Sequence, residues 1–202
     1  KRRPRREFEL RPLLFAVVEV LSVTADHPKY PLRHFFAGVA EYAFETRVGM
    51  ADPPLIDYIT DLLTRFISSD ALYSMRDLTG HRLGEVDDML AEAEARIGDA
   101  RRDVHRHIGD FTLFWAGVYP ESLGPPSLSK RLAKDRFVDY CQQGKKAYYI
   151  ASTLPSDTED VQSELLERLS NDFELCAFGL NEARKEWERR DAEGGWQLVV
   201  FN

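Results

Sequence analysis

Apolar side chains recur every third or fourth residue along almost the whole chain, and this spacing is the strongest constraint on its fold. The spacing places them on one face of an α-helix, whereas a half-buried strand alternates apolar and polar residues. Proline and glycine interrupt the pattern, which predicts helices over about residues 12–26, 32–50, 52–67, 85–118, 133–152 and 155–190. Helices with an apolar face must pack together, so the sequence predicts an all-α, single-domain bundle of six to seven helices.

The two ends of the chain are expected to differ from this bundle. Residues 1–11 are predicted to be a basic, flexible arm and residues 12–202 the helical bundle domain, a length that suits one domain. Residues 196–202 have a strand-like composition, which predicts a short extended tail. We expect this tail to dock on the bundle or to pair with a second copy of the chain, because one strand cannot pair with itself.

Two glycines and one isoleucine carry specific predictions about packing. The apolar stripe that begins at Val86 ends at Ile97, so Ile97 is expected to face inward. Gly98 follows it and leaves open whether residues 85–118 form one helix or two. Gly144 lies in a core stripe, which predicts that another backbone approaches closely there.

The charge of the chain is unevenly distributed. The net charge is −7, yet five of the first six residues are basic. Without those five, 22 Lys and Arg face 34 Asp and Glu, which leaves the rest of the chain at −12. An acidic body repels nucleic acid, so we expect no nucleic-acid binding except a weak, salt-sensitive contact through residues 1–6.

The start of the chain resembles an export signal in part. Arg5-Arg6-Glu7-Phe8 is similar to a twin-arginine pattern, and an apolar run from Leu13 to Val23 follows it. Glu19 interrupts that run, and no apolar stretch reaches the roughly 20 residues that a membrane-spanning helix needs. We therefore expect a cytoplasmic protein without a membrane span. The first residue is Lys1, so the sequence leaves open whether residues precede it.

Four polar residues are candidates for a ligand-binding site. His107 shares one flank of its predicted helix with Asp103 and Asp110, and a divalent ion accepts imidazole together with carboxylates. Glu19 lies in an otherwise apolar helix, where a buried carboxylate must be paired, hydrogen-bonded or neutral. Ordinary ion pairs explain the same four residues without a ligand, and the identity of any metal stays open.

The remaining reactive side chains indicate no chemistry. Cys141 and Cys176 both fall on core stripes, and two cysteines are too few for a cysteine zinc site. The aromatic residues before Pro120 have helical spacing, which is typical of core packing. No nucleotide-binding, nucleophile-elbow or zinc-protease motif is present, so we predict no catalytic residue and no cofactor.

One stretch resembles other proteins. Gly109-Asp110, Leu113-Phe114, Gly117 and Pro120-Glu121 follow the spacing Gly-Asp-x-x-Leu-Phe-x-x-Gly-x-x-Pro-Glu. This pattern is similar to a stretch in uncharacterised helical bacterial proteins and covers 17 of 202 residues, from His107 to Leu123. The resemblance implies a bacterial origin and a helix that ends at the proline, and it transfers no activity.

These observations favour a non-enzymatic cytosolic protein that acts through protein–protein interaction or self-association. The alternative is a helical bundle with an internal small-molecule or divalent-metal site, which would be compatible with an enzyme. That alternative requires the four candidate residues to converge on one place.

Overall fold

The computed structural model describes residues 29–66, 69–123, 130–156 and 161–192. Its elements are α2 (Lys29–Tyr42), the π-helix η1 (Ala43–Val48), α3 (Pro53–Phe66), α4 (Ser69–Leu72), α5 (Val86–Ala95), α6 (Gly98–Val118), the 3-10 helix η2 (Pro120–Leu123), α7 (Lys130–Thr153), α8 (Ser163–Asn171) and α9 (Phe173–Ala192). Seven of the described α-helices have nine residues or more. Within the same residues no strand forms, apart from an isolated bridge between Arg76 and Arg82. The prediction of an all-α bundle of six to seven helices is confirmed.

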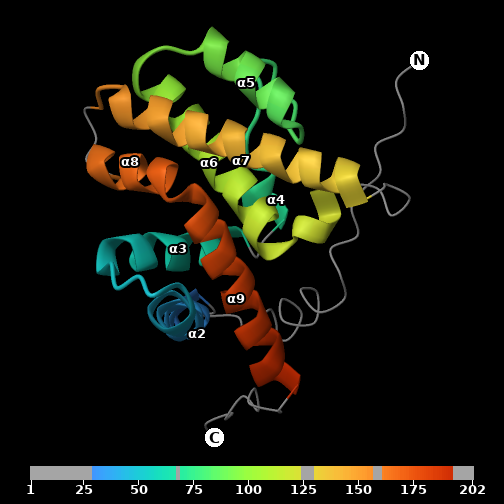
Figure 1. Ribbon diagram of the computed structural model, residues 1–202. Coiled ribbons are helices and arrows are strands. Elements are labelled where there is room, and N and C mark those ends of the chain that lie inside the picture. Colours follow the sequence, from blue (N-terminus) through green and yellow to red (C-terminus); the bar gives the residue numbers. More distant parts are fainter. Residues whose placement is uncertain (1–28, 67–68, 124–129, 157–160, 193–202) are drawn as a thin grey trace, which may run out of the picture.

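Helix α6 lies at the centre of this bundle. It packs against α7, α9, α5 and α3. In Figure 1, α5 lies at one end of the molecule, α2 and α3 lie together toward the other, and α9 runs from the middle past α3 and α2 to that second end. The aromatic residues of α6 and the residue after it are buried as predicted: Phe111, Phe114, Trp115 and Tyr119. Because several helices cover α6, four of its polar residues are buried against them: Arg102, His105, Asp110 and Thr112.

The first turn of α3 shows why that helix begins where the sequence predicted. Asp52 precedes Pro53, and its Oδ1 accepts the N–H of Leu55 at 3.3 Å. A carboxylate in this position satisfies one of the free N–H groups of a helix start, and proline is well suited to the first helical position. The other oxygen of Asp52 accepts a hydrogen bond from Arg168 of α8. The cap therefore also ties α3 to α8.

Gly98 divides the predicted helix over residues 85–118 into α5 and α6. Its φ is +57°, a left-handed conformation that glycine adopts without strain. Ile97 is extended at this break and 86% exposed. The prediction that Ile97 faces inward is therefore wrong, because the helical register that directed it inward stops at Ala95.

The predicted helix over residues 155–190 is also two helices, α8 and α9. The break falls at Asp172, whose N–H bonds to the carbonyl of Arg168 and whose carbonyl accepts the N–H of Cys176 at the start of α9. Asn171 and Asp172 are poor residues for a helix interior and good ones for a cap, because their side chains compete with the backbone. The apolar spacing continues across the break, so periodicity alone could not reveal it.

Close approach at Gly144 is confirmed, but the neighbour differs from the predicted backbone. A Cβ at Gly144 would lie 2.3 Å from the ring of Phe173 in α9 and 2.4 Å from the hydroxyl of Thr112 in α6. Two side chains therefore use the space that a larger residue would fill. Gly144 lets α7 press against α6 and α9 at once.

Several predictions lie outside the described residues. They concern the basic arm over 1–11, the apolar helix over 12–26 and the extended tail over 196–202. Among the described residues, no helix combines the length and the apolar character needed to cross a membrane.

Candidate functional site

A buried carboxylate, Asp110 of α6, lies where α3, α6 and α7 meet. It is 1% exposed. Its Oδ1 accepts two hydrogen bonds, from the hydroxyl of Tyr58 at 2.5 Å and from that of Tyr148 at 2.8 Å. Its Oδ2 accepts a bond from Nη2 of Arg65 at 3.1 Å. Asp110 thus joins two residues of α3 and one of α7 to the central helix.

The electrostatics of this cluster keep its hydroxyls protonated. Burial, followed by the nearby Asp110 carboxylate, raises the pKa of Tyr58 and of Tyr148 well above the usual tyrosine value. Burial acts to lower the pKa of Arg65, but Asp110 together with Tyr58 and Tyr148 outweighs it and the pKa rises. Two neutral donors and one cation therefore surround the carboxylate, which suits a stable polar contact between helices.

His107 lies one turn before Asp110 and is packed among aromatic rings. Its ring centroid is 5.8 Å from that of Phe66 and 6.4 Å from that of Phe111. Burial lowers its pKa, although the Asp110 charge and the backbone of Leu72 act in the opposite direction. Its Nε2 is buried without a hydrogen-bond partner. His107 is therefore a neutral ring that lies near Asp110 but packs against Phe66 and Phe111.

The other two candidate residues do not join this place. Asp103 is on the same flank of α6 as Asp110, but its side chain is 61% exposed and lies 3.6 Å from Arg106. The difference arises because α3 covers only the part of α6 that includes His107 and Asp110. Glu19 lies outside the described residues. The structure thus brings two of the four candidates together and leaves a third at the surface.

A metal site has little support from this arrangement. Within the described parts of the chain, no group of three or more His, Cys, Asp or Glu is placed to hold a metal ion. Tyr58, Tyr148 and Arg65 already donate three hydrogen bonds to Asp110, and Asp110 is 1% exposed, so a ligand can reach it only if these side chains move. The cluster can fix the relative positions of three helices without any bound group.

The sequence analysis missed Tyr58, Tyr148 and Arg65. The two tyrosines belong to apolar stripes, where they look like ordinary core residues. A buried tyrosine hydroxyl needs a partner, and an aspartate inside a core stripe needs donors. Together these two requirements could have indicated that a buried tyrosine bonds to Asp110. They do not reveal which helices meet, so they could not identify Tyr58 or Tyr148.

The carboxyl ends of two helices are held by buried or half-buried arginines. Arg102 of α6 donates to the carbonyls of Ala151 at 3.2 Å and Val161 at 2.6 Å, at the end of α7 and just before α8. Arg184 of α9 donates to the carbonyl of Val118 at 2.6 Å, at the end of α6. Cations are favourable at these ends because the last carbonyls of a helix carry partial negative charge. Both arginines therefore have a structural explanation.

The two cysteines are also explained by packing. Both are buried and free. Burial raises the pKa of Cys141 to about 11 and that of Cys176 to about 12, so both stay protonated at neutral pH. A reactive cysteine needs the opposite shift and access to solvent.

Comparisons of the chain with models of protein families, with curated proteins and with solved structures found no match. A function for this chain must therefore be derived from its own described residues.

Proposed function

We propose that this chain is a non-enzymatic protein that acts through association with a second copy of itself, and that the outer face of α9 makes the contact. The observation that carries this proposal is a pair of large apolar side chains, Leu175 and Phe178, each 47% exposed. They are three residues apart on one helix, so their side chains are neighbours. A helix face of this kind loses contact with water when it packs against another helix.

The charges on the same face favour a second copy in the antiparallel orientation. Glu174 lies beside Leu175 near the start of α9, and Lys185 lies on the same side two turns after Phe178. Within one copy Glu174 pairs with Lys145 of α7 and Lys185 pairs with Glu182. An antiparallel pair of α9 helices adds to these pairs by bringing Glu174 of one copy toward Lys185 of the other, twice over. The Phe178 side chains then meet near the two-fold axis, as an isologous dimer requires.

The buried polar cluster supports the absence of catalysis in this proposal. A general base or metal ligand needs lone pairs that can reach a substrate. Asp110 accepts three hydrogen bonds from Tyr58, Tyr148 and Arg65 and is 1% exposed, so a substrate in solvent does not reach it. An internal small-molecule or metal site has less support, because a ligand would first have to break this cluster. We also propose a cytoplasmic location, on the strength of Glu19 inside the leading apolar run, and a bacterial origin, on the strength of the Gly109–Glu121 resemblance.

Light scattering coupled to size-exclusion chromatography tests the proposal over a wide range of protein concentration. The full chain is expected to reach twice the monomer mass, with dissociation on dilution. Phe178→Glu places a charge at the centre of the contact and is expected to weaken the dimer about tenfold or more. Ile97→Glu is the matched control, because Ile97 is even more exposed but lies at the α5–α6 break. It is expected to leave the dimer unchanged.

A charge exchange tests the orientation. Lys185→Glu is expected to weaken the dimer. Adding Glu174→Lys together with Lys145→Glu, which keeps an ion pair between these two positions, is expected to restore it. A strictly monomeric chain, or a dimer that tolerates Phe178→Glu, would overturn the proposal.

A further inference from the structure

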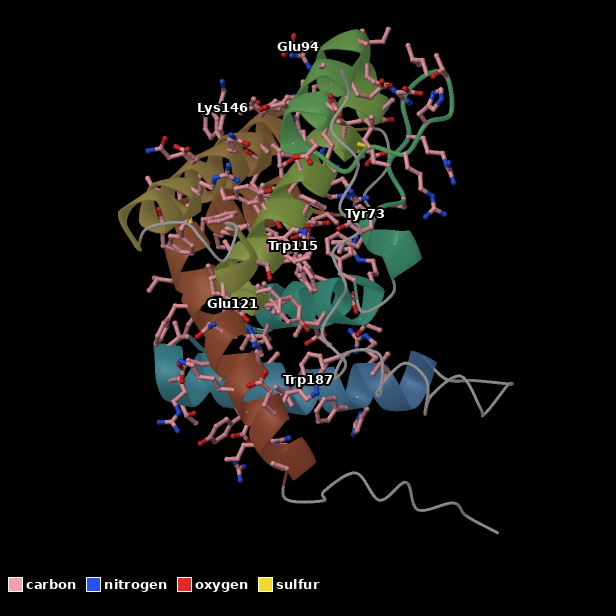
Figure 2. The ribbon with its side chains drawn as sticks, turned by 90° about the vertical axis from the view of Figure 1, so that its right-hand side faces the viewer. Tyr73, Glu94, Trp115, Glu121, Lys146 and Trp187 are labelled. Atoms are coloured by element: carbon pink, nitrogen blue, oxygen red, sulfur yellow. The ribbon has the colours of Figure 1, made fainter. Side chains whose placement is uncertain are left out.

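The beginning of α6 meets α5 and α7 at one end of the molecule, away from the Asp110 cluster. Arg101 and His105 are one turn apart on α6 and so lie on the same face. Glu94 comes from α5, and Lys146 comes from α7. Figure 2 shows Glu94 and Lys146 at the same end of the structure. We refer to Arg101, His105, Lys146 and Glu94 as the α6 entry cluster.

Polar atoms inside this cluster are buried without partners. His105 is 2% exposed, and neither of its ring nitrogens makes a hydrogen bond. The Nε of Arg101 is likewise buried and has no acceptor. Most buried polar groups in proteins are hydrogen-bonded, and an exception requires an explanation, such as a bound ion or ligand. Arg102, the next residue, shows the usual outcome, since it donates to two carbonyls.

The charges around His105 are predominantly positive. Burial lowers its pKa first, Arg101 lowers it further and Lys146 adds to that effect, whereas Glu94 opposes them. Glu94 also lies 3.3 Å from Nη2 of Arg101, with 73% of its side chain exposed. One exposed carboxylate thus touches the outer side of Arg101, while the inner Nε and the imidazole stay without an acceptor.

We propose that Arg101, His105 and Lys146 bind a small tetrahedral oxyanion of the phosphate class. A guanidinium, an imidazole and an ammonium group offer donors from two helices, and a tetrahedral anion can accept from several directions at once. A flat carboxylate has only two oxygens, and Glu94 already supplies one such group to Arg101. This site is independent of the α9 contact and goes beyond the proposed self-association.

The histidine ring signals in an NMR titration test the site on the full chain. Inorganic phosphate and glycerol phosphate are the two probes, and sodium chloride at equal ionic strength is the reference. The His105 signals are expected to shift and saturate with phosphate, and His105 is expected to titrate at higher pH, because a bound anion favours the imidazolium. A tighter response to glycerol phosphate indicates a phosphomonoester, and a tighter response to inorganic phosphate indicates the free anion. His81, in an exposed loop, is the internal control and is expected to follow sodium chloride alone.

Variants of the residues around His105 sharpen the test and leave the buried His105 ring in place. Glu94→Gln is expected to tighten phosphate binding about twofold to fivefold, since it removes an exposed competing pair. Arg101→Gln is expected to weaken it about tenfold or more, because hydrogen bonds to charged groups are strong. Lys146→Gln should weaken it as well, and Glu45→Gln, in η1, should have no effect. If His105 responds equally to phosphate and sodium chloride, or if Glu94→Gln fails to tighten binding, the site does not exist.

Discussion

Two buried polar residues of α6, Asp110 and His105, differ in whether their polar atoms have hydrogen-bond partners. In the second half of α6, Asp110 accepts three hydrogen bonds from two other helices. In the first half, His105 is almost as deeply buried, but neither ring nitrogen has a partner. A saturated buried group fixes how helices pack, whereas an unsaturated one lowers stability and leaves capacity for a ligand. The same helix therefore contains a structural centre and a candidate binding site.

The largest expected effect comes from removing the saturated group. Asp110→Ala is expected to lower the free energy of unfolding by about 3–5 kcal/mol, because two buried tyrosine hydroxyls lose their acceptor and a small cavity remains. Arg65 is half-exposed and can turn to water, so it adds little to the loss. Urea denaturation measures the change. Asp103→Ala, on the same flank but exposed, should change stability by no more than about 0.5 kcal/mol. Equal effects of the two variants would show that the cluster does not stabilise the fold.

A smaller effect is expected from crowding the same cluster. A Cβ at Gly109 would lie 2.6 Å from the ring of Tyr148, so Gly109→Ala must displace that ring, whose hydroxyl bonds to Asp110. We expect a loss of about 1–3 kcal/mol in unfolding free energy, the usual cost of overpacking. Gly84→Ala is the control, because its Cβ would meet Tyr73 at an ordinary 3.7 Å.

A double-mutant cycle shows whether the hydrogen bond between Tyr148 and Asp110 accounts for part of the stability that Gly109→Ala removes. In a Tyr148→Phe background, Gly109→Ala should cost less, because the bond to Asp110 is already absent. An unchanged cost would assign the whole effect to packing.

The sequence predicted the helices well because their apolar spacing is regular, and it failed where the chain changes direction. Ile97 continues the spacing of α5, yet a single left-handed glycine turns it outward. Asp172 breaks a helix whose apolar stripe does not change. At such breaks the local backbone conformation determines where a helix ends and which way the next residues face. The spacing of apolar residues carries no information about that conformation.

The sequence predicted only part of the candidate site, and the reason is related. Asp103 and Asp110 occupy the same flank of one helix, so their positions on α6 cannot distinguish them. Their different burial is set by where α3 crosses α6, and Tyr58 comes from 52 positions away in the chain. Contacts over that distance depend on the packing of whole helices, which no local pattern records.

The smallest expected effect is a dependence of stability on pH, which arises from two buried histidines of α6, His105 and His107. Burial lowers the pKa of His105 and of His107 below the ordinary 6.5. The unfolded chain therefore takes up protons on these histidines at a higher pH than the folded chain does. Stability is expected to be full above about pH 6.5, to fall as the pH drops below it, and to level off once the folded chain is protonated too.

Variants show how much each histidine contributes to the change of unfolding free energy with pH, referred to here as the slope. His105→Gln is expected to remove part of it and His107→Gln another part, whereas His81→Gln in the exposed loop should leave it intact. Urea denaturation at several pH values between neutrality and the onset of carboxylate titration measures the slope. Added phosphate should flatten only the His105 part, since the anion favours the charged ring in the folded chain. A slope that persists in the double variant would show that neither ring is buried in its neutral form. A phosphate effect that survives His105→Gln would place the anion elsewhere.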